Sequence, residues 1–181
     1  MTDVPDSPKE FFTQFLPSRF EALKAGLAGK SSSGSMVFRV QGAGEWSMRL
    51  KDGEIEVSEG MHDDVIIQVT VSSEDFKPIF VQGAIMQGDA EIKPEQQVLA
   101  FKALTVDAER VKLVQNIAGT VAFVVDAGGA THRLAITPGK AEPKIDAPDC
   151  RLECKMSDFM DMQTGKQNPM QLAMGGKIKI V

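Results

Sequence analysis

The sequence predicts an α+β protein built from two similar units. Three observations support this prediction: short segments in which apolar and polar residues alternate, helix-start signals around those segments, and blocks of sequence that recur about 85 residues apart. Alternation is typical of strands with one buried face, and capping residues mark helix N-termini. We place the units at residues 1–105 and 106–181. Each is expected to hold a mainly antiparallel sheet packed against helices on one face.

Composition and charge exclude several classes of protein. The chain has 181 residues, of which 43% are hydrophobic and 25% charged, enough to bury a sizeable core. Its net charge of −5 argues against general affinity for nucleic acid. No apolar run approaches the roughly 20 residues that span a bilayer. The first ten residues lack the basic and apolar regions of a secretory signal, so we expect a soluble cytoplasmic protein.

Helices are predicted at the N-terminal end. Ser7-Pro8-Lys9-Glu10 forms a capping box with proline at the first helical position, and Ser18-Arg19-Phe20-Glu21 forms another after Pro17. We therefore expect helices over about 7–16 and 18–28. Their apolar stripe is Phe11, Phe12, Phe15, Leu16, Phe20, Leu23 and Leu27. A Gly- and Ser-rich loop should cover 29–35.

Period-two alternation follows the loop and predicts an antiparallel meander with one buried face. Asp52-Gly53 is a strong signal for a hairpin turn. The expected strands cover about 36–41, 46–50, 54–57 and 65–71. The solvated face should carry the acids Asp52, Glu54, Glu56, Glu59, Asp63 and Asp64.

Further elements are predicted after this sheet. Ser72-Ser73-Glu74-Asp75 starts a helix, a short strand covers about Ala90 to Ile92, and a helical stretch runs from Pro94 to about Ala118 with a break near 105–107.

The chain then repeats itself in five blocks. Phe38 corresponds to Phe123 and Asp64 to Asp149, both at an offset of 85, and Asp75-Phe76 corresponds to Asp158-Phe159 at an offset of 83. The remaining blocks pair 42–44 with 127–129 and 88–92 with 176–180. The same order at a nearly constant offset indicates a tandem duplication.

Several motifs resemble the sterol carrier protein type 2 family of lipid-binding domains. The first unit carries Phe38-Arg39-Val40, the segment Gly44 to Gly53, and Ser73-Glu74-Asp75-Phe76. The second carries Met156 to Pro169, with its Thr-Gly-Lys-x-Asn-Pro turn, and Gly176-Lys177-Ile178-Lys179-Ile180. The resemblance covers about 12–104 in the first unit and 106–181 in the second.

The resemblance implies a five-stranded sheet in each unit, packed against helices on one face. It also implies an apolar tunnel for a sterol, fatty acid or acyl-coenzyme A, closed by a final helix after the last strand. Two departures stand out: the first unit lacks the Lys-x-Asn-Pro segment after Gly83, and the second unit lacks the closing helix after Val181. An uncovered apolar surface there is compatible with a homodimer.

Catalytic and metal signals are weak. The two histidines, His62 and His132, have no nucleophile or metal pattern around them, so we expect no enzyme activity and no cofactor. Cys150 and Cys154 lack a second pair and are interpreted as small apolar residues in a reducing compartment. Gly29-Lys30-Ser31 lacks the upstream glycine and the preceding strand of a phosphate-binding loop.

The apolar residues point to a binding cavity. The chain has ten Met, ten Phe and no Tyr, and Met adapts to cavities of irregular shape. The candidate lining in the first unit is Trp46, Met48, Phe76, Ile79, Phe80, Ile85, Met86, Val98, Phe101 and Leu104. In the second unit it is Leu152, Phe159, Met160, Met162, Met170, Leu172 and Met174.

Two functions fit these residues. The first is a non-enzymatic lipid-binding or lipid-transfer protein for a fatty acyl, isoprenoid or sterol-like ligand, with transient membrane contact as an option. The alternative is a scaffold or dimerisation module that uses the same fold with a filled core.

Overall fold

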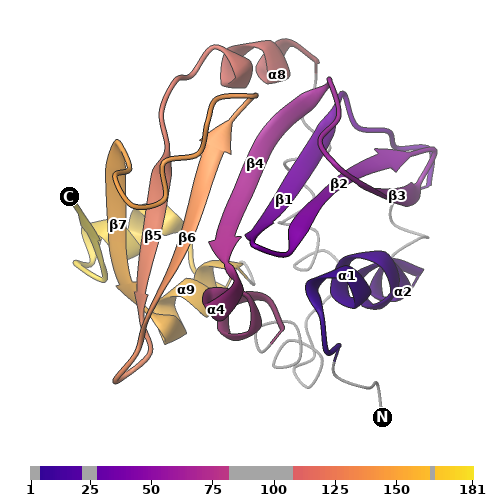
Figure 1. Cartoon of the computed structure of the whole chain (residues 1–181). Helices are drawn as coiled ribbons and strands as arrows, with labels where there is room; N and C mark the ends of the chain where they lie inside the picture. Colours follow the sequence, from indigo (N-terminus) through magenta and orange to yellow (C-terminus); the bar gives the residue numbers. More distant parts are fainter. Residues whose placement is uncertain (1–4, 22–27, 82–107, 164–165) are drawn as a thin grey trace.

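A single mixed sheet forms the centre of the protein (Figure 1). The computed structural model describes residues 5–21, 28–81, 108–163 and 166–181. Eight strands lie in the order β3-β2-β1-β4-β6-β5-β7-β8. Their bounds are β1 Ser35–Gln41, β2 Gly44–Lys51, β3 Glu54–Glu59, β4 Val65–Ser72, β5 Val121–Asp126, β6 Thr131–Pro138, β7 Cys150–Lys155 and β8 Ile178–Ile180. The predicted α+β class is confirmed.

The first four strands form the sheet that the alternation predicts, with one correction. β1, β2 and β3 pair antiparallel, and the turn at Asp52-Gly53 has positive φ at both residues, as a tight hairpin requires. β4, however, pairs parallel to β1, so the strands do not form a simple meander. The short connection from β3 crosses over β2, where Ser47 Oγ donates to the Gly60 carbonyl oxygen. This crossing brings the chain back beside β1.

The second half repeats this pairing. β5 pairs antiparallel with β6 and parallel with β7, as β1 does with β2 and β4. Residues 139–149 form a loop where the first half has β3. The described part of the second unit thus holds four strands, and the expected five per unit is not confirmed. The predicted strand at 90–92 lies outside the described residues.

The two halves join through their strands. β4 and β6 pair antiparallel from Ile67 opposite Pro138 to Val71 opposite Leu134. β4 and β7 are equivalent strands, and each has an antiparallel neighbour on its outer side. That neighbour is β6 for β4 and β8 for β7. The result is one continuous sheet instead of two separate ones. The boundary predicted at residue 105 falls outside the described residues and stays a prediction.

The N-terminal helices form one continuous run, and the predicted break at Pro17 is wrong. α1 Pro8–Glu10, η1 Phe11–Phe15 and α2 Leu16–Glu21 follow one another directly. η1 is a π-helical turn that ends just before α2, so Pro17 directly follows a local widening of the helix. Ser7 caps α1 as predicted, since its side chain accepts from the Glu10 N–H.

The remaining helices follow strands. α4 Ser73–Phe76 is capped by Ser72 and continues into a second π-helical turn, η2 Lys77–Val81. α8 Ala108–Gln115 precedes β5 and ends before the predicted end at about Ala118. α9 Met156–Gln163 follows β7, and α10 Pro169–Met174 precedes β8. The predicted helix at 94–107 lies outside the described residues.

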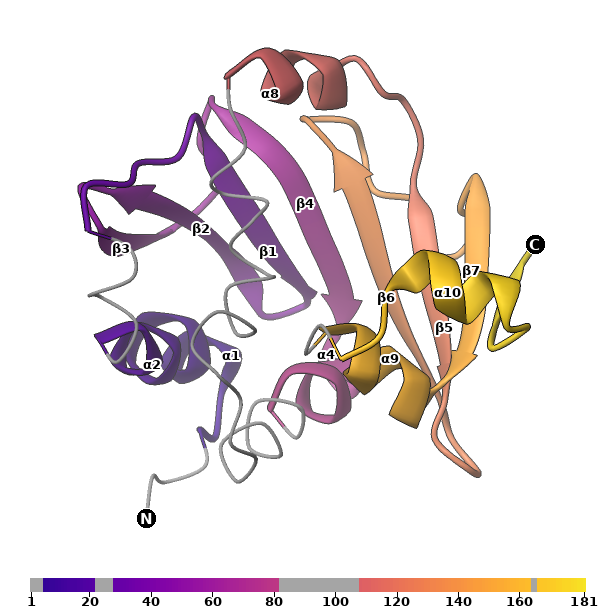
Figure 2. The same cartoon turned by 180° about the vertical axis from the view of Figure 1, so that it is seen from behind.

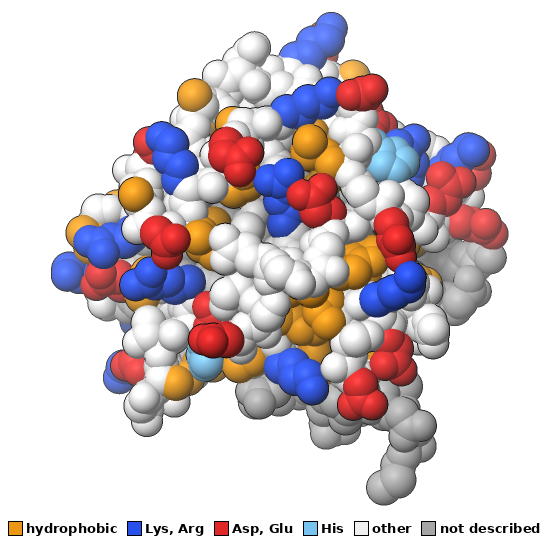
Figure 3. Space-filling model, in the orientation of Figure 1, with side chains coloured by type: hydrophobic (Ala, Val, Ile, Leu, Met, Phe, Trp, Pro, Cys, Tyr) orange, Lys and Arg blue, Asp and Glu red, His pale blue; other side chains and the backbone are white. Residues whose placement is uncertain are grey.

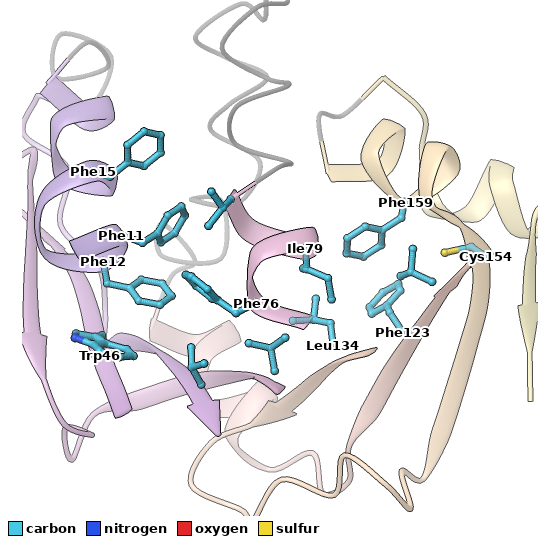
Figure 4. Packing of buried hydrophobic residues seen from close by; sticks show 14 of the residues in the cluster. Phe11, Phe12, Phe15, Trp46, Phe76, Ile79, Phe123, Leu134, Cys154 and Phe159 are labelled. Carbon is cyan, nitrogen blue, oxygen red and sulfur yellow. The ribbon is translucent and has the colours of Figure 1, made fainter. Parts of the chain in front are cut away.

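The sheet has one apolar face and one polar face. The helix-covered face, seen in Figure 2, holds a continuous cluster of buried side chains contributed by both halves (Figure 4). The opposite face carries acidic and basic side chains spread over its surface (Figure 3). Any apolar ligand site between described elements therefore belongs to the helix-covered face. No helix in the described part of the chain is long and apolar enough to cross a membrane.

Candidate functional site

Most of the predicted lining residues meet on the helix-covered face. The buried cluster includes Trp46, Phe76, Ile79, Phe159 and Leu172, with Phe80, Leu152, Met160 and Met162 packed against it. Met48 lies in a smaller adjoining cluster with Met36 and Leu50. The other predicted residues, Ile85, Met86, Val98, Phe101 and Leu104, lie outside the described residues.

Aromatic rings fill the first half of this face. Phe12 is fully buried, and its ring centroid lies 5.0 Å from those of both Phe38 and Trp46. It also lies 5.8 Å from Phe76 and 6.1 Å from Phe80. Stacked and edge-to-face rings at these distances make a dense, rigid interior. The described rings here form a densely packed core.

The phenylalanines of the N-terminal helices were missing from the predicted site. Phe11, Phe12 and Phe15 project into the cluster, as Figure 4 shows, and all three are buried. Their i, i+1 and i+4 spacing signals a buried helix stripe, but a stripe in the sequence does not say which strands it covers.

The second half of the same face is packed differently. Phe123 and Phe159 form one ring pair, 5.6 Å apart. Around it lie aliphatic and sulfur-containing side chains from β7, α9 and α10: Leu152, Met156, Met160, Met162 and Ala173. Methionine has more rotatable bonds than phenylalanine and repacks around objects of different shape. This region is the adaptable part of the interior.

Met170 and Met174 do not line this interior, which corrects the prediction. They are 70% and 84% exposed, whereas Leu172 between them is buried. In a helix, residues two apart lie on roughly opposite sides, so α10 directs Leu172 inward and both methionines outward.

A polar chain links the two halves beside the apolar cluster. His132 Nδ1 of β6 lies 2.9 Å from Asp75 Oδ1 of α4, and Ser72 Oγ donates to the other oxygen of that carboxylate. These are the residue types of a nucleophilic triad, but the serine contacts the aspartate and not the histidine. The histidine therefore cannot take the serine proton, and the arrangement is a helix cap with an added cross-strand contact.

His62 belongs to a second polar network, on the opposite face. Its Nδ1 accepts from Arg49, and its Nε2 lies 2.6 Å from Ser58 Oγ. Asp64 accepts from Arg49 and from Ser35 Oγ. Both ring nitrogens of His62 are thus occupied, and the described residues hold no group of three or more potential metal ligands.

The cysteines behave as apolar residues. Both thiols are free, Cys154 is buried in the main cluster, and Cys150 is partly buried. Burial, with a smaller effect of the Asp158 charge, raises the pKa of the Cys154 thiol to about 11. A protonated, buried thiol is a poor nucleophile.

A surface hollow of about 410 Å³ opens at the hairpin between β1 and β2. Arg39 and Thr70, which line it, alternate with core residues along their strands and so lie on the polar face. Arg39 Nε lies 2.7 Å from Glu45 Oε1, although its N–H does not point at that oxygen. Charges of both signs make this hollow unsuitable for an apolar ligand.

One family model matches the C-terminal part of the chain. Residues 98–181 match the model of the SCP-2 sterol transfer family, as the sequence motifs predicted. The match includes β5 to β8 and helices α8 to α10. It points to lipid binding or transfer. No curated protein matches the chain.

Two solved structures match part of the chain. The solution structure of the sterol carrier protein domain 2 of Helicoverpa armigera is 25% identical, covers 49% of this chain and 79% of its own, and gives a TM-score of 0.33. The crystal structure of sterol carrier protein 2 like 2 from Aedes aegypti is 12% identical, covers 49% of this chain and 88% of its own, and gives a TM-score of 0.28.

Proposed function

We propose that the protein is a non-enzymatic lipid carrier that holds one apolar ligand in its second half, between strands β5 and β7 and helices α9 and α10. The observation that supports this most is the family match, which falls on residues 98–181. The ligand is a fatty acyl, isoprenoid or sterol-like molecule. Its binding needs no covalent step.

The packing supports the same assignment. Both residues 1–105 and residues 106–181 contain five Met, but residues 1–105 add eight Phe and the single Trp, whereas residues 106–181 add two Phe. A ligand can enter where side chains are able to move aside, and methionines at α9 move at low cost. Burial then contributes about 25 cal/mol per Å² of apolar surface, which is enough without a charged clamp.

The scaffold hypothesis has its own support in the first half. The Phe12 cluster fills the helix-covered side there, and β4 pairs directly with β6. We assign the first half to the stable part of a shared sheet and the second half to the ligand. The two candidate functions are thereby divided between the halves.

The first experiment asks whether a lipid is carried at all. The full chain, purified from cells, is extracted with organic solvent and the extract is analysed by lipid mass spectrometry. We expect a stoichiometric apolar lipid, and uptake of a fluorescent fatty acid by the delipidated protein. If neither is found, the carrier function is wrong and the scaffold function stands.

The second experiment locates the ligand. Met160→Ser with Met162→Ser changes partly buried side chains of α9, and Ile55→Ser with Val57→Ser changes partly buried side chains of β3 as a matched control. We expect fatty-acid uptake to fall about tenfold in the α9 pair, because two apolar contacts are lost, and to stay within twofold in the β3 pair. Equal losses in both pairs would contradict the assignment to the second half.

Trp46 provides an independent check, since it is the only tryptophan and lies in the first half. A brominated fatty acid quenches indole emission only at contact distance. We expect Trp46 emission to be unchanged on loading, and emission from a Trp46→Phe, Phe159→Trp variant to be quenched.

A further inference from the structure

Exposed apolar side chains gather at one edge of the sheet. Among the described residues, Met170, Met174, Ile180 and Val181 are large apolar residues that remain exposed at the C-terminal end of the chain. They belong to α10 and to strand β8 with the residue after it. We call α10 and β8, with Val181, the edge surface. Figure 2 shows α10 in front of the sheet, close to the chain end.

The backbone holds these side chains in place. Lys177 N–H donates to the Leu172 carbonyl oxygen, which ties the end of α10 to the start of β8. Val181 and Arg151 exchange backbone hydrogen bonds, which fixes β8 against β7. Ile178 is buried in the core, and alternate residues of a strand share a face, so Ile180 lies on the same side as α10. Met170 and Met174 are four residues apart and share the outer side of α10.

Basic side chains lie near the apolar ones. Lys166 and Lys177 are on the helix side, where they pair with acids of α9, whereas Lys179 alternates with Ile180 in β8 and points to the other face of the sheet. Residues 162–181 contain Lys166, Lys177 and Lys179 and no acid. Each lysine forms an ion pair with an acid of β7 or α9, at 4.0 Å for Lys166, 3.4 Å for Lys177 and 3.4 Å for Lys179. The three lysine side chains are about half exposed or more, and such pairs contribute little. Their ammonium groups can also bind phosphate oxygens.

The opposite edge of the sheet carries the opposite charge. β3 forms that edge, and residues 51–64 hold six acids and one lysine. Residues 150–181 hold five basic residues and three acids. This asymmetry orients the molecule in the field of an anionic surface, so that β8 approaches first and β3 points away.

We propose that the edge surface docks on an anionic lipid bilayer, with Met170, Met174 and Ile180 entering the interface and the lysines on the same side contacting headgroup phosphates. Exposed apolar side chains with lysines on the same side, here Lys166 and Lys177, are the combination that favours interfacial binding. The surface adjoins the proposed ligand region through Leu172, which is buried in the same cluster as Phe159. Docking on a bilayer does not depend on the proposed function. Only the idea that the docked protein passes a lipid to or from the bilayer rests on the proposed function.

The experiment is sedimentation of the full, delipidated chain with vesicles of phosphatidylcholine alone and of phosphatidylcholine mixed with phosphatidylglycerol. We expect binding to the anionic vesicles that weakens as salt rises. Met170→Ser with Met174→Ser, and separately Lys166→Gln with Lys177→Gln, should each lower the vesicle affinity about tenfold.

The matched control is Leu113→Ser with Ile117→Ser. These residues are 66% and 56% exposed and lie in and just after α8, away from the edge surface. This pair should bind vesicles as the unaltered chain does. Sedimentation velocity of each variant without lipid measures its oligomeric state. This tests whether a second copy of the chain, instead of a bilayer, covers the edge surface.

The outcomes separate the hypotheses. Absence of vesicle binding, or an equal loss in the control pair, overturns docking by this surface. A dimer that the Met170 and Met174 pair converts to monomer, with vesicle binding unchanged, assigns the surface to a second copy instead. A chain that binds vesicles but carries no lipid contradicts the proposed function alone, and a chain that carries lipid but binds no vesicle contradicts docking alone.

Discussion

The two halves of the sheet share a strand pattern but differ in what packs on it. In both, a central strand pairs antiparallel with the next strand and parallel with a later one. The first half covers these strands with stacked rings, and the second covers them with one ring pair and several methionines. One backbone plan thus supports a rigid interior on one side and an adaptable interior on the other.

The shared plan extends to individual contacts at the start of the parallel strands. Asp64 accepts from Ser35 Oγ, and Asp149 accepts from the Thr120 N–H. Each aspartate directly precedes the strand that pairs parallel with the central one, and both pairs of residues are 85 apart in the sequence. Equivalent contacts at equivalent places are what a duplication predicts.

The first helix after each parallel strand also carries an aspartate in contact with a nitrogen-bearing side chain. Asp75 of α4 contacts His132, and Asp158 of α9 contacts Lys177. His132 belongs to β6, which lies beside β4, and Lys177 directly precedes β8, which lies beside β7. In the first half, β6 and His132 therefore occupy the places that β8 and Lys177 occupy in the second half.

The largest expected loss of stability comes from removing one ring of the aromatic cluster. Phe12→Ala removes a fully buried ring that contacts several others, so the free energy of unfolding should fall by about 4 kcal/mol. Phe159→Ala removes an equally buried ring with one aromatic neighbour, and its softer surroundings should collapse partly into the gap, which limits the loss to about 2–3 kcal/mol. Urea unfolding of both variants measures the difference.

Ligand uptake provides the control for this comparison. Phe159→Ala should weaken fatty-acid uptake, whereas Phe12→Ala should leave it unchanged at temperatures where the variant is folded. A larger stability loss at Phe159 than at Phe12 would show that the second half is the more rigid one, and the distinction between the halves would fail.

Much of the local structure follows from the sequence, because it depends on neighbours in the chain. The Asp52-Gly53 hairpin, the Ser7 and Ser72 caps and the strand starts all depend on turn or cap chemistry within a few residues. The change of offset from 85 to 83 also has a local cause: β4 has eight residues and β7 has six.

The sequence pattern could not predict which strands lie next to each other in the sheet. Alternation fixes which side of a strand is buried but not its neighbour, so the parallel β1–β4 pair and the β4–β6 junction had no local signal. The outward direction of Met170 and Met174 was missed for a similar reason. An apolar residue in a short helix is assigned to the interior by composition, and only the buried position of Leu172 shows which side of α10 faces the core.

An intermediate effect is expected from pH at Cys154, which lies among the adaptable side chains. Its folded-state pKa of about 11 exceeds its ordinary value of 9.0, so the folded state holds the proton more tightly than the unfolded state does. This contribution to stability is complete below pH 9 and is lost as the pH rises to about 11.

Urea midpoints measured across that range should therefore fall more steeply for the unaltered chain than for Cys154→Ala. Cys150→Ala is the matched control, because Cys150 lies on the same strand with a more exposed side chain, and it should follow the unaltered chain. Identical profiles for all three would mean that the second half admits enough water to solvate the thiolate.

The smallest expected effect concerns Asp149, the second-half equivalent of Asp64. The Thr120 N–H, with Lys144, lowers the pKa of the Asp149 carboxyl below its ordinary value of 3.8. A lowered folded-state pKa contributes stability above pH 3.8 that is lost as the pH falls further.

Asp149→Asn keeps an oxygen for the Thr120 N–H but removes the charge, so the variant should lose only a small part of its stability at neutral pH. Its stability should also depend less on pH in the acid range, as measured by urea midpoints. Asp146→Asn, an exposed position in the same loop, should retain the acid dependence of the unaltered chain, because its contact with Arg133 is longer at 3.6 Å. If the two variants had the same pH profile, the charge of Asp149 would not contribute to stability, and Asp149 and Asp64 would act through backbone geometry alone.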